Sequence, residues 1–174
     1  MRVSDERDVI DEWMSRWPDD LPLDREVEGI VDRISFLNKR IKKMLEETLV
    51  EFGLNVGEWH VLSALWNSGE PYRSSPGTLA KRAELTTGAM TNRIDRLESE
   101  GYVRRLPDPD DRRGVIVELT PAGHDVWKRS VGAQAMKEQF VASALDAEER
   151  EQLNTLLRRM VLRADSTHAP STVA

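Results

Sequence analysis

Between residues 87 and 96, polar side chains recur at helical spacing, and their chemistry suits the edges of base pairs. At about 100° per residue, Gly88, Asn92 and Arg96 share one stripe of a helix, with Thr91 on its flank and Thr87 at its start. Arginine pairs bidentately with guanine, asparagine pairs with adenine, and threonine contacts a phosphate or a thymine methyl group. These five residues are therefore candidates for contacts in a DNA major groove, although an ordinary solvated helix face has a similar composition.

The surrounding residues predict two short helices that position this stripe. Ser75 can cap a first helix that starts at Pro76, where a missing backbone N–H is tolerated. After a short break, Thr86 or Thr87 can cap a second helix that runs to about Gly101. The apolar stripe of this second helix consists of Met90, Ile94 and Leu97. Two helices with so short a break between them predict a helix-turn-helix.

A β-hairpin with a charged tip is predicted to follow directly. Residues 102–106 and 115–119 are rich in β-prone side chains, and residues 107–114 between them are rich in turn formers. Arg112 and Arg113 lie at the tip, beside Asp110, which can hold a guanidinium in place. Arginine on a thin projecting loop suits a narrow minor groove, whereas an exposed hairpin with a local ion-pair cluster is the simpler alternative. The hairpin and the two helices together predict a winged helix.

Three stretches of this region resemble the multiple antibiotic resistance regulator (MarR) family: TGAMTNRIDRLESEGYVRR, DPDDRR and VELTPAG. The resemblance covers roughly residues 27–163, and the DPDDRR stretch with the following LTxxG pattern is its most specific part. It implies a homodimeric winged-helix regulator whose affinity for DNA is set by a small ligand. It places Thr91, Asn92 and Arg96 in the recognition helix, and Arg112 or Arg113 in the minor groove.

An amphipathic helix is predicted near the start of the chain, from Ser4 to Trp17. Its two tryptophans, Trp13 and Trp17, need a surface to cover, which is either the main domain or a ligand pocket. An extra N-terminal helix of this kind is similar to the urate-responsive branch of the MarR family. Of that branch's ligand-contacting positions, Trp13 and Arg93 match, whereas His60 and Asn67 stand where the branch has Asp and Arg. Urate itself is therefore disfavoured.

The resulting candidates for an effector pocket are Trp13, Trp17, His60 and Arg93. His60 lies beside the apolar stripe of a helix predicted over residues 56–67, where histidine is most often a structural residue. Arg93 borders the apolar stripe of the recognition helix, where a structural ion pair is the alternative to anion binding. The resemblance and these residue types together predict an anionic aromatic effector or another small metabolite.

Long apolar stripes in the remaining helices predict a dimer. Asp24 caps a helix with a wide apolar side that extends to Phe52 and ends at Gly53. Two further helices follow the wing, the second opened by a capping box at Asp146. The expected organisation is an acidic N-terminal helix and linker (1–23), a dimerisation helix (24–55), a winged helix-turn-helix domain (56–119), C-terminal dimerisation helices (120–164) and a flexible tail (165–174).

Composition narrows the classes of protein that remain. The 174 residues are 39% hydrophobic and 32% charged, with neither a bilayer-length apolar run nor an apolar leader, which predicts a cytoplasmic protein without membrane association. The chain has no cysteine, so thiol-based sensing and cysteine-ligated metals are excluded. Residues 1–30 contain ten acids and four bases and account for the whole net charge of −6, whereas residues 71–114 contain nine bases and seven acids. A surface facing DNA is therefore compatible with the acidic total.

No pattern of catalytic residues is evident. The three histidines lack a neighbouring nucleophile or acid in a catalytic arrangement, and no phosphate-binding glycine loop or HExxH pattern occurs. We expect no enzyme activity, no cofactor and no metal site. The predicted fold is mainly α with a small β-hairpin wing. The predicted function is a ligand-responsive, DNA-binding transcriptional repressor that acts as a homodimer, and the alternative is a winged-helix protein-interaction module without a DNA function.

Overall fold

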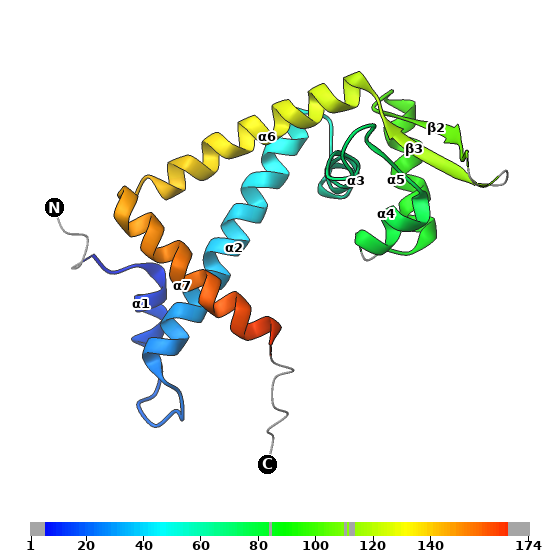
Figure 1. Ribbon diagram of the computed structural model, residues 1–174. Coiled ribbons are helices and arrows are strands. Elements are labelled where there is room, and N and C mark those ends of the chain that lie inside the picture. Colours follow the sequence, from blue (N-terminus) through cyan, green and yellow to red (C-terminus); the bar gives the residue numbers. More distant parts are fainter. Residues whose placement is uncertain (1–5, 84, 110, 112–113, 167–174) are drawn as a thin grey trace, which may run out of the picture. The chain divides into compact units, whose positions relative to one another are not determined.

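The computed structural model describes residues 6–83, 85–109, 111 and 114–166, which form seven helices and three strands (Figure 1). The predicted fold class, mainly α with a small antiparallel sheet, is confirmed. The chain divides into two compact units, residues 1–134 and residues 135–174, which are described separately. Among the described residues, no helix is both long enough and apolar enough to cross a membrane.

Two capped helices form the frame of the first unit. Helix α2 spans Arg25–Glu51, and the predicted cap at Asp24 accepts hydrogen bonds from the backbone N–H groups of the first turn. Gly53 follows in the left-handed conformation, with φ of 69°, and turns the chain into α3, which spans Val56–Trp66. At the start of α3, Asn55 and Glu58 form a reciprocal capping box, a pattern that satisfies two otherwise unpaired N–H groups.

The predicted helix-turn-helix is present. Helix α4 spans Pro76–Arg82 with Ser75 as its cap, and α5 spans Thr87–Ser99 with Thr86 as its cap. Both helices turn apolar side chains toward α3 and form one core with it. The fully buried members of this core include Leu62, Leu65, Leu79, Met90, Ile94 and Leu97.

A three-stranded antiparallel sheet completes the winged lobe, which consists of α3, α4, α5 and the strands of this sheet. Its strands are β1 (Arg73–Ser74), β2 (Val103–Pro107) and β3 (Val115–Leu119), in the order β1-β3-β2. β2 and β3 form the predicted hairpin, in a register that pairs Val103 with Leu119 and Pro107 with Val115. Sequence analysis missed β1, because a strand of two residues has no alternating pattern to detect.

Helix α6, Pro121–Ala142, leaves the sheet through a tightly packed first turn. The Thr120 hydroxyl accepts a hydrogen bond from the backbone N–H of Gly123, as expected of a capping threonine. Gly123 is buried against the backbone of Tyr102, so that a Cβ atom at this position would lie 2.0 Å from the Tyr102 carbonyl oxygen. The LTxxG stretch therefore marks a contact between two backbones, which only glycine permits.

Helix α1 is shorter than predicted. It spans Val9–Met14, not Ser4–Trp17, and its cap is Asp8, which forms a capping box with Asp11. Ser4 lies outside the described residues. Asp8 and Asp11 offer the helix a reciprocal pair of side-chain acceptors, a stronger start than a single serine.

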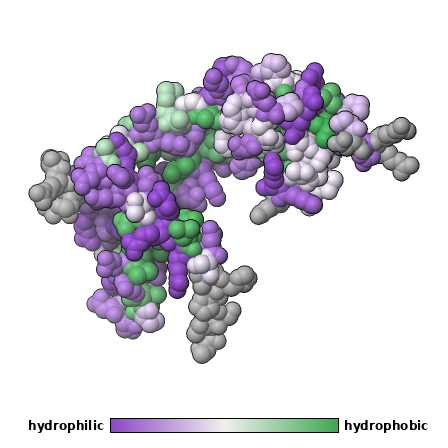
Figure 2. Space-filling model, in the orientation of Figure 1, coloured by the Kyte–Doolittle hydropathy of each residue, from purple (hydrophilic) through white to green (hydrophobic). Residues whose placement is uncertain are grey.

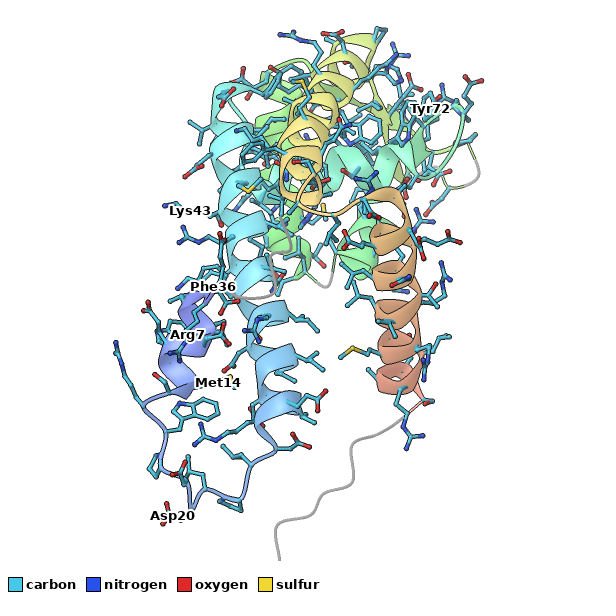
Figure 3. All side chains as sticks on the ribbon, turned by 90° about the vertical axis from the view of Figure 1, so that its left-hand side faces the viewer. Arg7, Met14, Asp20, Phe36, Lys43 and Tyr72 are labelled. Carbon is cyan, nitrogen blue, oxygen red and sulfur yellow. The ribbon has the colours of Figure 1, made fainter. Side chains whose placement is uncertain are left out.

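Two arginines of α2 hold α1 in place. Arg33 donates from Nε to Asp8 Oδ2 at 2.8 Å and from Nη2 to Asp11 Oδ1 at 2.6 Å. Arg25 donates to the backbone carbonyls of Met14 and Trp17, at 2.8 and 3.1 Å. Figure 3 shows Arg7 and Met14 beside one end of α2, whereas Tyr72 lies in the lobe at the other end.

The packing of α1 against α2 should depend on pH. Hydrogen bonds from Arg33, and then from the backbone of Asp11, hold the pKa of Asp8 below its ordinary value of 3.8. The stabilisation is therefore complete above pH of about 4 and is lost as the pH falls through the lower pKa of the folded state. We expect amide-exchange protection factors of residues 9–14 to be constant from pH 7 to pH 5 and to fall below pH 4.

The variant Asp8→Asn separates charge from capping in the same experiment, since asparagine caps a helix as well as aspartate does. It should lower the protection of residues 9–14 at pH 7 and weaken the acid-dependent loss. Protection of Leu62 and Leu65, in the core of the lobe, serves as the internal reference. If the protection of residues 9–14 decreased equally at low pH in the wild type and in the variant, the proposed role of Asp8 would be contradicted.

Helix α2 also presents an uncovered apolar face. The exposed apolar side chains that make up this face are Val27, Ile30, Val31, Ile34, Leu37 and Ile41. Hydrophobic residues are visible among hydrophilic ones on the surface of this helix in Figure 2. A stripe of this length indicates a contact surface.

The second unit contains the end of α6 and helix α7, Ala147–Asp165. The predicted capping box is formed by Asp146 and Glu149. On α7 no side chain among the described residues is buried. Its exposed apolar side chains are Leu153, Leu156, Met160, Val161 and Leu162, and those at the end of α6 are Met136, Phe140 and Val141.

Candidate nucleic-acid interface

The first two turns of α5 present the predicted polar stripe to solvent. Thr87, Gly88, Thr91 and Asn92 are all exposed, whereas Met90 on the other side of the helix is buried. The Thr91 hydroxyl donates to the Thr87 carbonyl at 3.0 Å, and the Asn92 side chain forms no hydrogen bond within the described part of the chain. Short polar groups with unused donors and acceptors suit contact with base edges and phosphates.

Arg96 shares this stripe but is held by other parts of the protein. Its Nε lies 3.0 Å from Oε1 of Glu58, whose side chain is only 3% exposed. Its Nη2 donates to the Gly53 carbonyl at 3.5 Å. The helical spacing of Arg96 therefore correctly places its backbone on the stripe, whereas its guanidinium reaches sideways to the turn between α2 and α3.

The base of the wing is well defined. The backbone N–H of Asp108 donates to the Gly114 carbonyl at 3.1 Å, one step beyond the last strand pair. A Cβ atom at position 114 would lie 2.8 Å from Cβ of Asp108, so glycine is required for this close approach. The predicted tip residues Asp110, Arg112 and Arg113 lie outside the described residues.

An ion-pair cluster that the sequence analysis did not identify joins the wing to α5. Arg105 of β2 donates from Nη2 to Asp95 at 2.5 Å and also pairs with Glu98, whose carboxylate accepts the Arg105 backbone N–H at 2.8 Å. Burial opposes the charge, but the bonds to Asp95 and Glu98 outweigh it and raise the pKa of Arg105. A double contact between a strand and a helix fixes their relative position.

A second cluster crosses all three strands on the other face of the sheet. Glu118 of β3 is buried and pairs with Arg73 of β1 and Arg104 of β2, its neighbours in the strand register. Burial opposes the carboxylate charge, but the hydrogen bonds from Arg104 and then Arg73 outweigh it and lower the pKa of Glu118. Two charges against one leave this face with a net positive charge. The alternating pattern of residues 115–119 could have indicated that Glu118 lies on the face of the sheet that points away from the core.

The four predicted effector residues do not gather in one place within one chain. Trp13 is 47% exposed and lies with α1 near Gly29 of α2. His60 belongs to α3, which packs near Leu49. At 1.5 Å per residue, Gly29 and Leu49 are about 30 Å apart along α2. Helices α1 and α3 lie at different ends of α2 (Figure 1), so Trp13 and His60, which belong to them, are far apart within one chain.

His60 instead lines a groove between α3 and α4, with a volume of about 550 Å³. The groove is lined by His60, Ser63, Ala64, Asn67, Arg82 and Ala83. Arg82 donates from Nη1 to the Ser68 hydroxyl at 3.1 Å and brings a positive charge to one end. Sequence analysis did not identify Arg82 as a lining residue of this groove. The predicted end of a helix near Arg82 does not show that this end packs beside His60 of another helix.

Arg93 lies near the other end of the same side of α3. Its guanidinium covers Gly57, where a Cβ atom would lie 2.5 Å from Arg93 Cζ. Gly57 and His60 are one turn apart on α3, so they face the same side. Arg93 has no carboxylate partner among the described residues. The structural ion pair that we considered for Arg93 is therefore absent from the described part of the chain.

Comparison with known proteins agrees with this geometry. A family model described as MarR family matches residues 54–115. The HTH-type transcriptional regulator PecS of Dickeya dadantii is 30% identical over 153 residues, which cover 88% of this chain and 90% of PecS. The multiple antibiotic resistance protein MarR of Escherichia coli K12 is 30% identical over 131 residues, covering 74% and 88%.

Solved structures give the same result. The apo form of MarR from Escherichia coli superposes with a TM-score of 0.64 at 28% identity, covering 74% of this chain and 94% of that one. A mutant of the same protein complexed with operator DNA has a TM-score of 0.61 at 28% identity, covering 80% and 99%. The YusO protein of Bacillus subtilis has a TM-score of 0.70, with coverage of 84% and 100%, and at 22% identity it supports the fold alone.

Proposed function

The chain belongs to the MarR family, and from this membership we propose that it regulates transcription as a homodimer that binds a pseudo-palindromic operator and is released by a small effector. The observation that carries the proposal is the exposed polar stripe on the first two turns of α5, next to the base of a wing. The operator complex of the related MarR adds support for DNA as the partner. Repression is the expected mode of action.

Contacts with DNA are assigned to the recognition helix and the wing. Thr87, Gly88, Thr91 and Asn92 would enter the major groove, since the N-terminal part of a recognition helix contacts base edges. The wing, with Asp110, Arg112 and Arg113, would reach the adjacent minor groove. The position of Arg96 beside Glu58 favours a different role, developed below.

A second copy of the chain is the proposed cover for the apolar faces. The exposed stripe of α2 and the exposed apolar residues of α6 and α7 belong to residues 24–55 and 120–164, the two segments assigned to dimerisation. A twofold axis would place two recognition helices about 34 Å apart, one turn of the DNA helix. Two half-sites with that spacing follow from the symmetry.

The groove between α3 and α4 is the proposed effector site within one chain. His60, Asn67 and Arg82 provide polar and positively charged groups beside apolar carbon, which suits a small aromatic acid. Trp13 lies with α1 near Gly29, and the Trp17 carbonyl accepts a hydrogen bond from Arg25, so both lie about 30 Å away along α2 and are not part of this groove in the same chain. The similarity of α1 to the N-terminal helix of the urate-responsive branch remains a proposal, and the residues at positions 60 and 67 argue against urate.

Selection of bound duplexes from a random pool tests the proposed function. We expect enrichment of a pseudo-palindrome with half-sites about 10 base pairs apart, because two recognition helices must lie on one face of the duplex. The affinity for DNA should fall as the salt concentration rises. The salt slope, which is the slope of the logarithm of the binding constant against the logarithm of the salt concentration, should become smaller in magnitude by about two when Arg112→Ala and Arg113→Ala are combined, whatever the DNA sequence.

The same assay distinguishes the alternatives. If no duplex is enriched, the DNA-binding proposal fails and a protein-interaction module is favoured. Once an operator is in hand, small aromatic acids are added to the complex, and release by one of them supports the effector proposal. An effector must bind the DNA-free state more tightly than the DNA-bound state, since equal affinity shifts no equilibrium.

A further inference from the structure

We infer that Glu58 is a positioning residue that anchors the recognition helix through Arg96, and that Arg96 is an anchor rather than a reader of bases. This inference rests on the proposed DNA-binding function for its effect on affinity, but the anchor itself can be measured without DNA. On this inference, the exposed polar stripe on the first two turns of α5 contacts the bases, and the third turn attaches the helix to the start of α3.

Glu58 has the geometry of a group that holds two elements together. Its Oε2 accepts the Asn55 backbone N–H at 2.9 Å, which completes the cap of α3, and its Oε1 lies 3.0 Å from Nε of Arg96. Both carboxylate oxygens are thus used, on a residue that is 2% exposed. A buried carboxylate is stable only when it is paired, so loss of Arg96 leaves one oxygen without its charged partner.

Arg96 contributes a second contact at the same turn. Its Nη2 donates to the carbonyl of Gly53, the residue that ends α2 in the left-handed conformation. Carbonyl groups at the C-terminal end of a helix favour a nearby cation. One guanidinium therefore joins the end of α2 and the first turn of α3 to the third turn of α5, which a lysine with a single charged nitrogen would not do equally well.

Arg93 strengthens the same attachment one turn earlier. Its guanidinium lies over Gly57, the residue before Glu58, at a distance that leaves no space for a Cβ atom. Two arginines on successive turns of α5 therefore contact the first turn of α3. The exposed stripe on the first two turns of α5 remains free for DNA, while Arg93 and Arg96 fix the orientation of the helix against the start of α3.

The first test measures the anchor in the free protein. Glu58→Gln keeps the side chain's size and its ability to complete the capping box, but removes the charge. Arg96→Met keeps the aliphatic stem and removes the guanidinium. We expect amides of residues 94–99 to exchange about tenfold faster in both variants, while those of Leu62 and Leu65 in α3 keep their protection. Unchanged exchange in residues 94–99 would overturn the inference.

The second test is a double-mutant cycle on operator affinity. We expect each single variant to bind about tenfold more weakly, and the double variant to lie within about twofold of either single variant. The salt slope should stay at the wild-type value, because no phosphate contact is lost. Glu100→Gln is the matched control, since it makes the same change in charge at the end of α5 without a paired arginine among the described residues.

The outcomes separate the anchor from a direct contact and from failure of the proposed function. If Arg96→Met still lowers affinity about tenfold in the Glu58→Gln background and reduces the salt slope by about one, Arg96 contacts DNA and the inference is wrong. If Arg96→Lys restores the affinity lost in Arg96→Met without restoring amide protection, the same conclusion holds. If the wild type binds no duplex, the proposed function fails, and amide exchange alone decides whether the anchor exists.

Discussion

Gly123→Ala is expected to lower the free energy of unfolding by about 3 kcal/mol, at the upper end of overpacking effects. The added Cβ would lie 2.0 Å from the Tyr102 carbonyl oxygen and 2.9 Å from Leu119 Cδ1. The Tyr102 carbonyl is not free to retreat, because it accepts hydrogen bonds from the backbone N–H and the hydroxyl of Thr120, at 3.0 and 3.1 Å. The first turn of α6 would have to separate from the sheet.

Urea denaturation at a fixed protein concentration measures this effect, with Gly132→Ala as the control on the same helix. Gly132 is exposed, and nothing lies within 4 Å of a Cβ atom placed there. Because alanine favours a helix by about 1 kcal/mol relative to glycine, the control variant should be slightly more stable than the wild type. Shifts of equal size and sign in both variants would refute the packing argument.

Ile94→Ala and Asn92→Ala should have opposite profiles, although the two residues are two positions apart on α5. Ile94 is fully buried in the core of the lobe, and its truncation should lower the free energy of unfolding by about 3 kcal/mol. Asn92 is exposed, and its truncation should change stability by less than about 0.5 kcal/mol. Operator affinity should nevertheless fall by about 1–3 kcal/mol in Asn92→Ala, with altered preference at one base pair.

Chemical denaturation and duplex titration on the same preparations check both profiles. The sequence preference of Asn92→Ala is measured with operators that carry single base-pair changes. If Asn92→Ala binds the operator and all its variants as the wild type does, the exposed stripe of α5 is not the reading surface.

Helices α2, α4 and α5 were predictable because each has a local start signal and an apolar side. Ser75 and Asp24 cap helices at the predicted residues, and the apolar stripe of α5 is the buried one. The end of α5 was placed near Gly101, and the helix ends at Ser99 with Gly101 in the left-handed conformation just beyond it. Periodicity defines the middle of a helix better than its last turn.

Sequence patterns do not show where a side chain lies when its position depends on parts of the chain far away in sequence. The spacing of Arg96 predicts the direction in which its side chain leaves the helix. The side chain is long, however, and its guanidinium turns sideways to pair with the buried Glu58. Trp13 and His60 were grouped because of their types, yet their distance depends on where α1 and α3 pack along α2. The strand Arg73–Ser74 exists only because β3 is its partner.

The contacts of Arg105 with Asp95 and Glu98 have a mechanical consequence for release from an operator. On the proposed DNA-binding mode, with the base of the hairpin tied to α5, neither would leave its groove while the other stays behind. A small molecule would have to tilt or displace the whole lobe as one rigid body, so dissociation would be concerted, without a half-bound intermediate in which only the minor groove is vacated.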